Sequence, residues 1–216
     1  YNNTGVETMS WTFGQAARFF SIVKWKGNGT QQTIHHNLGV KPGLIIVKSL
    51  RETSWIVYHA SIGAGKYWQM QSKLAAIEDT TVFANIAPTE NYFMVGGSTQ
   101  TNCNGYDYIA YCFANDTTPD SIIKSGSYVG NGSASGPSVS LGWEPQYVIV
   151  RAVNRQRGFA TEYSAVMWIN SSKAEEYPMC LRSNASGFAP TTADADVNAS
   201  GVTYAYLAIK RNTVQP

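Results

Sequence analysis

The chain of 216 residues has few charged side chains. Asp, Glu, Lys and Arg make up 14% of it, against about 25% in an ordinary soluble domain. Sixteen basic and fourteen acidic residues leave a formal charge of +2, and no run of like charge is longer than Glu175-Glu176. Nucleic acids and anionic membrane surfaces are bound by basic patches or stripes. The sequence therefore predicts that neither is a main partner.

Long hydrophobic runs are also missing from the sequence. No apolar stretch approaches the roughly 18 residues of a membrane-spanning helix, so we expect no membrane insertion. The first residues, Tyr1 to Gly5, lack the charged and apolar regions of a signal peptide. Because the chain begins with Tyr1 and not with Met, we expect it to be a piece of a longer protein.

The residue patterns that mark most enzyme and metal sites do not occur. The sequence has no Cys-x-x-Cys, His-Glu-x-x-His or Gly-x-Ser-x-Gly motif and no phosphate-binding glycine loop. Its three cysteines stand at unrelated positions, which argues against a disulfide framework. Asp194 to Asn198 alternates oxygen ligands but lacks the glycine and the final acid of a calcium loop. We therefore expect no catalytic residue, no metal site and no cofactor.

The sequence does contain an internal repeat. Four pieces return 103 residues later in the same order: Gly27-Asn28-Gly29, Leu38-Gly39, Pro42 and 45–48 become Gly130-Asn131-Gly132, Leu141-Gly142, Pro145 and 148–151. The segment 102–113 returns 96 residues later as 198–209. Matches that keep one register indicate a duplicated unit. The seven residues that the second copy lacks predict a shortened loop, where a change of length costs little.

The repeated pieces have the composition of strands and turns. The β-branched runs 43–48 and 147–151 predict central strands buried on both faces, and the alternating segments 106–113 and 202–209 predict strands with two unlike faces. Further strand candidates lie between clusters of Gly, Asn, Ser and Thr: 54–59, 66–71, 92–95, 165–170 and 179–182. The helical candidates, 12–20 and 73–79, are short. Many short strands with frequent turns predict an all-β fold of two tandem, homologous antiparallel β-sandwich units, jelly-roll-like, with short helical turns.

The domain boundaries follow from the repeat. The polar segment 115–120 contains a proline and comes after the end of the first copy, so we predict a linker there. The first unit is then 20–114 and the second 121–216. Residues 1–19 are predicted to be an N-terminal connecting segment.

Several motifs of the first copy form a pattern that is known from one family. They are Trp11-x-Phe13 with Phe19-Phe20, Gly-Asn-Gly-Thr at 27–30, Ile34-x-His36-Asn37-Leu38-Gly39-x-x-Pro42, Trp55-x-Val57-Tyr58-His59, and Tyr-x-Ala-Tyr-x-Phe at 108–113. This pattern resembles C-terminal modules of tail-fibre and receptor-binding (adhesin) proteins of tailed bacteriophages. The resemblance covers residues 11–114 well and 121–211 weakly. Its motifs specify a fold rather than a ligand.

The resemblance implies a protein of the virion tail, extracellular after release, that binds a host cell-surface glycan or outer-membrane protein. It implies contacts with other tail proteins and a homotrimer, and it supplies no catalytic residue. A structural virion component, such as a tail, baseplate or capsid-decoration subunit, is the alternative. A glycan depolymerase is a second alternative, because the separation of paired carboxylates cannot be read from sequence.

Aromatic and basic residues outside the repeated pieces are the candidates for receptor binding. Aromatic faces stack on sugar rings and on protein anchors, and a basic cluster follows the strand 147–151, where loops carry function. The predicted receptor-binding residues are Tyr67, Trp68, Trp143, Arg155, Arg157, Tyr163 and Trp168. The alternative for the tryptophans is the core, since Trp is highly buried on average. The alternative for the arginines is a solvated turn.

Overall fold

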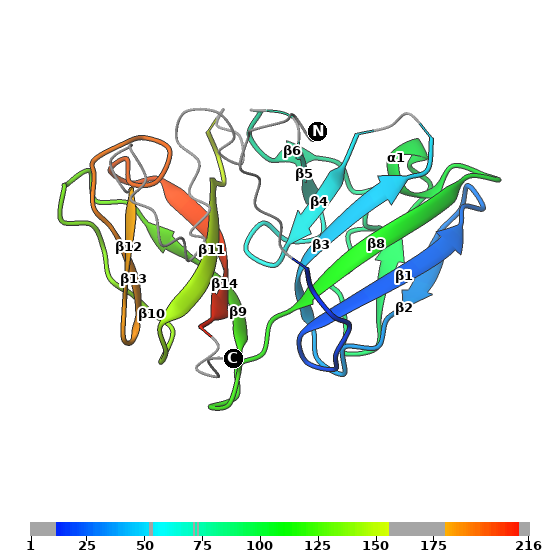
Figure 1. Cartoon of the computed structure of the whole chain (residues 1–216). Helices are drawn as coiled ribbons and strands as arrows, with labels where there is room; N and C mark the ends of the chain where they lie inside the picture. The colour runs from blue at the N-terminus through cyan, green and yellow to red at the C-terminus, as the bar shows by residue number, and fades with distance from the viewer. Residues whose placement is uncertain (1–11, 52–53, 71, 73, 156–179, 212–216) are drawn as a thin grey trace, which may run out of the picture.

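The computed structural model shows a protein built almost entirely of antiparallel strands (Figure 1). The structure describes residues 12–51, 54–70, 72, 74–155 and 180–211. Every strand pair in these ranges is antiparallel. The sheets pack face to face, which confirms the predicted all-β sandwich class.

The first half contains a six-stranded and a two-stranded sheet. The larger sheet has the order β1 (Phe20–Lys26), β8 (Asp107–Ala114), β3 (Pro42–Ser49), β4 (Ile56–His59), β5 (Lys66–Gln69), β6 (Ile77–Glu78). The smaller sheet pairs β2 (Gln32–His35) with β7 (Tyr92–Val95). The single short helix of the described residues, α1 (Thr99–Asn102), precedes β8.

The alternation of β8 divides the six-stranded sheet into two faces. The inner face packs against β2 and β7: Trp25 stacks on Tyr108 with ring centroids 5.3 Å apart and meets Phe93 of β7 edge-on at 5.9 Å. We call the opposite side the outer face. Its β8 residues are Ile109, Tyr111 and Phe113. Both faces of this strand are therefore apolar.

The second half contains two three-stranded sheets. One has the order β11 (Pro145–Ala152), β14 (Thr203–Lys210), β9 (Ile123–Val129). The other has the order β10 (Val139–Ser140), β13 (Gly187–Pro190), β12 (Leu181–Asn184). Phe188 joins the two sheets, because its ring meets Tyr128 at 6.0 Å and Tyr206 at 5.3 Å, both edge-on.

A buried asparagine holds one corner of each half. In the first half the Asn102 side chain accepts a hydrogen bond from the Asn28 backbone N–H (3.1 Å) and donates to Asn28 Oδ1 (3.1 Å), to the Gly96 carbonyl (2.9 Å) and to the Thr30 carbonyl. Asn102 is fully buried. Its carboxamide therefore supplies the partners that the tight turn at 27–30 would otherwise lack.

Asn198 makes the corresponding bonds in the second half. Its side chain accepts from the Asn131 N–H (2.9 Å) and donates to Asn131 Oδ1 (3.0 Å), to the Ser133 carbonyl (2.7 Å) and to the Thr192 carbonyl (2.9 Å). The first glycine of each turn also lies in the same surroundings in both halves, close against a backbone carbonyl. A Cβ on Gly27 would lie 2.1 Å from the Cys103 carbonyl oxygen, and one on Gly130 would lie 2.3 Å from that of Ala199.

The two halves lie side by side (Figure 1), and buried residues of both belong to one hydrophobic cluster. The outer face of the six-stranded sheet meets the β11-β14-β9 sheet there. The residues in contact are Leu44, His59 and Trp68 from the first half and Ile149, Arg151, Ala205, Tyr206 and Leu207 from the second. The cavity left between them is only about 10 Å³, about the least that a single water molecule needs. The halves are therefore joined by packing as well as by the predicted linker.

Two buried polar side chains cross this interface. The Arg151 guanidinium lies over the Trp68 ring, 5.1 Å from its centroid, and donates to the carbonyls of Gln69 (3.3 Å), Ser72 (2.9 Å) and Leu74 (2.8 Å). His59 Nε2 lies 3.0 Å from the Tyr206 carbonyl oxygen. Since His59 Nδ1 accepts from the Ser61 N–H at 3.1 Å, the proton is on Nε2 and the imidazole is neutral.

The helical predictions are wrong within the described residues. Residues 12–15 are in no helix or strand, Ala16 pairs with Phe20, and Arg18 has a φ of 61°. Three contacts with the rest of the first half favour this path over a helix: Phe13 packs on Phe113 with centroids 5.6 Å apart, the Arg18 N–H donates to Leu38 O (2.7 Å), and the Arg18 guanidinium pairs with Asp116 (2.8 Å). In 73–79 the structure has β6, because Ile77 pairs with Tyr67.

Most strand predictions agree with the structure to within two residues. The segment 92–95 is β7 as predicted, 43–48 and 106–113 lie in β3 and β8, and 179–182 overlaps β12. Segment 147–151 lies in β11, which is at an end of its sheet in the described residues and not central. Segment 165–170 lies outside the described residues. The sequence analysis did not predict β1, β2, β9, β10 or β13.

The buried asparagine corners give a prediction on stability. Replacing Asn102 or Asn198 by Ala leaves buried backbone groups without partners, at about 1–3 kcal/mol each. We expect Asn102→Ala and Asn198→Ala each to lower the free energy of unfolding by about 3 kcal/mol in urea titrations. Asn104→Ala, at an exposed position of the same corner, is the control and should change it by less than about 0.5 kcal/mol. Equal effects at all three positions would contradict this role.

The buried imidazole gives a prediction on pH. Burial lowers the pKa of His59 from 6.5 to about 4. Between about pH 6.5 and pH 4, His59 is protonated in the unfolded chain but neutral in the folded chain. The free energy of unfolding therefore falls as the pH drops through this window. The loss through this group is at most ~3 kcal/mol.

The measurement is the difference between wild type and His59→Gln, in which the amide can still donate to the Tyr206 carbonyl. This difference is needed because burial also lowers the pKa of His36. We expect urea midpoints of the variant to depend less on pH over this window. Parallel curves for both proteins would refute the assignment.

Candidate functional site

Three of the predicted receptor-binding residues are in the core. Trp68 is 1% exposed, and Tyr67 and Trp143 are each 5% exposed. Trp68 lies at the interface of the halves under Arg151, and Trp143 belongs to the core of the second half. None of the three offers a ring face to a ligand. The prediction of a binding role is wrong for them, because small sandwiches fill their cores with large aromatic side chains.

The other predicted residues divide into two groups. Arg155 is exposed on the loop that follows β11, as expected for a basic cluster after a strand. Arg157, Tyr163 and Trp168 lie outside the described residues. The structure therefore brings no two of the seven predicted residues together on the surface that it describes.

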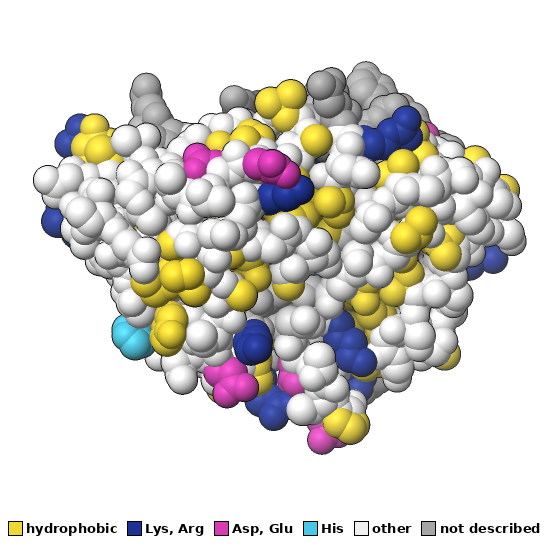
Figure 2. Space-filling model, turned by 180° about the vertical axis from the view of Figure 1, so that it is seen from behind, with side chains coloured by type: hydrophobic (Ala, Val, Ile, Leu, Met, Phe, Trp, Pro, Cys, Tyr) yellow, Lys and Arg dark blue, Asp and Glu magenta, His cyan; other side chains and the backbone are white. Residues whose placement is uncertain are grey.

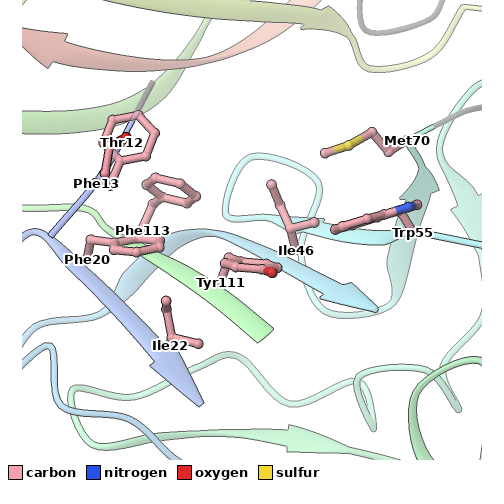
Figure 3. A pocket seen from close by; sticks show the side chains of 9 residues that line it. All are labelled: Thr12, Phe13, Phe20, Ile22, Ile46, Trp55, Met70, Tyr111 and Phe113. Atoms are coloured by element: carbon pink, nitrogen blue, oxygen red, sulfur yellow. The ribbon is translucent and has the colours of Figure 1, made fainter. Parts of the chain in front are cut away.

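An apolar groove on the outer face is the best-formed candidate for a binding site in the described residues (Figure 3). Its volume is about 390 Å³. Phe20 and Ile22 come from β1, Tyr111 and Phe113 from β8, and Ile46 from β3. The full lining is Thr12, Phe13, Phe20, Ile22, Ile46, Trp55, Met70, Tyr111 and Phe113. None of these side chains is charged.

The strand register explains why these residues meet. Ile22 pairs with Tyr111, and Tyr111 pairs with Ile46, so the three side chains form one row across β1, β8 and β3. All three are half-buried. Two residues along the strands, Lys24, Ile109 and Lys48 form the next row. The outer face therefore changes from apolar at the groove to basic in the next row of side chains.

The segment before β1 forms one end of the groove. Phe13 packs edge-on against Phe113 and lies 6.3 Å from the Tyr147 ring of the second half. The Arg18–Asp116 pair ties this segment to the chain that leaves β8, and Asp116 is buried to 4% exposure. Hydrogen bonds from Thr118 and Arg18 lower the pKa of Asp116 against the opposing effect of burial. The carboxylate therefore stays charged and paired.

Trp55 is the exposed aromatic of the groove. It is 37% exposed, and its ring is stacked on Tyr111 with centroids 6.3 Å apart (Figure 3). The sequence analysis missed both residues as site candidates because they belong to the segments that define the fold. One signal could have found them: β8 is apolar on both faces, which requires a cover on each side.

In the described residues, no group of three or more His, Cys, Asp or Glu is close enough to hold an ion. The carboxyl groups with a shifted pKa are Glu78 and Asp116, and both are lowered. A glycosidase needs a general acid whose pKa is raised. The groove lining also has no carboxylate.

A second hollow of about 350 Å³ involves residues of both faces of the sheet near the end of β1 and the start of β8, and is lined by Lys24, Trp25, Leu50, Asp107, Tyr108 and Ile109. The face seen from behind carries charged side chains of both signs. Lys and Arg lie there in small separate groups, several of them beside Asp or Glu, and they form no basic stripe on that face (Figure 2). Among the described residues, no helix is long and apolar enough to cross a membrane.

A family profile described as a domain of unknown function (DUF7483) matches residues 2–212. The chain belongs to the DUF7483 family. Comparisons with curated proteins and with solved structures gave no match. The profile spans both halves of this DUF7483 chain in one match, so the family unit includes the interface as well as the groove. The family description carries no activity, and the function is therefore argued from the geometry.

The placement of the tryptophans gives a prediction. We expect Trp68→Ala to lower the free energy of unfolding by about 3–5 kcal/mol, because it opens a cavity at the interface of the halves. Trp55→Ala removes a ring that is already partly in water and should cost about 1 kcal/mol or less. Urea unfolding followed by far-ultraviolet circular dichroism measures both. Similar losses in the two variants would contradict the core position of Trp68.

Proposed function

We propose that this protein is a non-catalytic structural module of a virion tail that joins a neighbouring protein through the open part of its outer face. The resemblance to tail-fibre modules supports the tail. The observation that carries the structural role is the partly exposed apolar row of Ile22, Tyr111 and Ile46, with Trp55 beside it, on the part of the surface that the structure describes. Exposed apolar surface of this kind marks a contact with another macromolecule.

The lining favours a protein neighbour over a glycan. A sugar needs several hydrogen-bonding groups beside the aromatic face on which it stacks. In the groove, Thr12, the Tyr111 hydroxyl and the Trp55 ring N–H are the polar side-chain groups among nine lining residues. The remaining lining residues are apolar, so they can pack against an aliphatic or aromatic surface of another protein without hydrogen bonds.

We also infer that the two halves arose by duplication of one unit. The asparagine corners, with matched hydrogen bonds and crowded glycines, support this inference. So does the strand order, since β1-β8-β3 and β9-β14-β11 run alike in the two halves. Duplication makes a rigid two-unit body from one design, which suits a building element of a fibre.

A receptor-binding adhesin is the second candidate. Arg155, exposed beyond β11, is the observation that favours it. On this hypothesis the loop would contact an acidic glycan or an outer-membrane protein of the host. A glycan depolymerase has less support, because the groove lining has no carboxylate.

The test uses virions of the virus whose genome encodes this chain. We expect antibodies against the purified chain to label virion tails in immunogold electron microscopy, because the module is a part of the tail. Unlabelled particles would refute the proposal. Free protein added with virions separates the two candidates: an adhesin competes for receptors and slows adsorption to host cells, whereas a structural module leaves adsorption unchanged. New reducing ends in host polysaccharide would indicate the depolymerase.

A further inference from the structure

Side chains cross the outer face in rows that are two residues apart along each strand. Phe20 pairs with Phe113 in the row on which Phe13 packs, and the ring centroids of Phe13 and Phe113 are 5.6 Å apart. The next row is partly exposed, and the row after it carries two lysines. We call these the middle row and the basic row: the middle row is Ile22, Tyr111 and Ile46, and the basic row is Lys24, Ile109 and Lys48.

The chain enters the groove directly beside the middle row. Thr12 precedes Phe13 and also lines the groove (Figure 3). Residues 1–11 lie outside the described ranges, and residue 11 is bonded to Thr12. The DUF7483 profile matches from residue 2 onward, so these residues belong to the family unit. A segment of this same chain is therefore tethered within reach of the middle row.

The sequence before Phe13 has the alternation of a strand with one apolar face. Met9, Trp11 and Phe13 are apolar, and the residues that separate them, Ser10 and Thr12, are polar. In an extended segment, side chains two positions apart point to the same side and lie about 7 Å apart. The rows of the outer face have the same spacing, because they too are two residues apart along their strands. An extended continuation beyond Phe13 thus places Trp11 over the middle row and Met9 over the basic row.

Charge and size match as well. Glu7 is the one charged side chain among residues 1–11. In the extended arrangement it lies one row beyond Met9, close to Lys24 and Lys48 of the basic row, which carry the opposite charge. Three strands about 4.8 Å apart, crossed by rows about 7 Å apart, make the open patch on the order of 200 Å². Because a Trp side chain buries about 150–250 Å², one tryptophan is enough to cover it.

We propose that residues 7–11 bind in the groove of their own chain as an extended strap, with Trp11 over the middle row and Glu7 beside the lysines of the basic row. The tether to Thr12 lets a contact of this small size form, because the segment is held beside its site. The inference rests on the proposed function in one respect: the strap and the neighbouring protein compete for the middle row. The strap then keeps this row out of water until the neighbour takes its place.

Fluorine NMR of the whole chain labelled with 5-fluorotryptophan tests the strap. The chain has six tryptophans, and the Trp11 signal is the one that disappears in Trp11→Phe. We expect this signal to lie away from its position in the urea-unfolded chain. We also expect it to shift less than in the unfolded chain when H₂O is replaced by D₂O, because a ring packed on Tyr111 is shielded from solvent.

Charged substitutions on the two sides of the segment test the alternation. Met9→Arg puts a cation over the basic row and should move the Trp11 signal to its position in the unfolded chain, with the full solvent shift. Tyr111→Arg changes the floor of the groove and should act alike. Ser10→Arg is the matched control: its side chain points away from the sheet in the strap, so the signal should stay as in wild type. Unchanged Trp68 and Trp143 signals in the same spectra show that each variant is folded.

Three results would overturn the inference. A wild-type Trp11 signal at the position and solvent shift of the unfolded chain means that the groove does not hold the segment. A shielded Trp11 that ignores both Met9→Arg and Tyr111→Arg packs elsewhere. A signal that moves toward the unfolded position on dilution of the protein comes from a segment bound to another copy.

The immunogold result separates this inference from the proposed function. A solvent-exposed Trp11 together with labelled virion tails would refute the strap alone and leave the structural function standing. A shielded Trp11 that responds to the variants, with unlabelled virions, would refute the tail and leave the strap standing.

Discussion

The constraint on which this structure depends is that the central strands are apolar on both faces. A sheet of this kind cannot keep either side in water without exposing a large hydrophobic surface. In the first half, β2 and β7 cover the inner face, and the β11-β14-β9 sheet of the second half covers part of the outer face. The interface, the shared core and the groove all follow from this need for a second cover.

The polar groups at the interface fix how the halves are placed. Burial of Arg151 lowers its pKa to about 10, and the guanidinium still finds three backbone carbonyls and the Trp68 ring. A buried donor without partners would cost free energy in any shifted arrangement. His59 acts in the same way through the Tyr206 carbonyl. Apolar packing drives the halves together, and these directional bonds select one orientation, so the molecule is a rigid double unit.

The proposed assembly role uses the apolar groove of the outer face. That groove is lined mainly by aliphatic and aromatic side chains, which suit a contact with another protein. The tryptophans that the sequence suggested for a ligand instead hold the two halves. Trp55 is more exposed than these tryptophans because it lines the groove, where the second half no longer covers the outer face.

The sequence by itself determined the strand class, the turns and the places where the two halves correspond. Gly29 and Gly132 illustrate this, because each has a positive φ (75° and 68°) that a residue without Cβ adopts readily, and the repeated Gly-Asn-Gly sequence indicates such a turn. Segments with local signals, such as 43–48 and 92–95, were predicted correctly for the same reason. The segment 12–20 was not, because distant contacts of Phe13 and Arg18 overrule its helical composition.

Only the tertiary structure decided which aromatic residues are buried and which face is open. Trp68 and Trp55 are thirteen positions apart and chemically identical, yet one is 1% exposed and the other 37%. The difference depends on how far the second half reaches across the first. That reach is set by contacts between residues some 80 to 150 positions apart, such as Arg151 with Gln69 and His59 with Tyr206. Local composition carries no trace of such contacts, and the groove therefore became visible only in the folded chain.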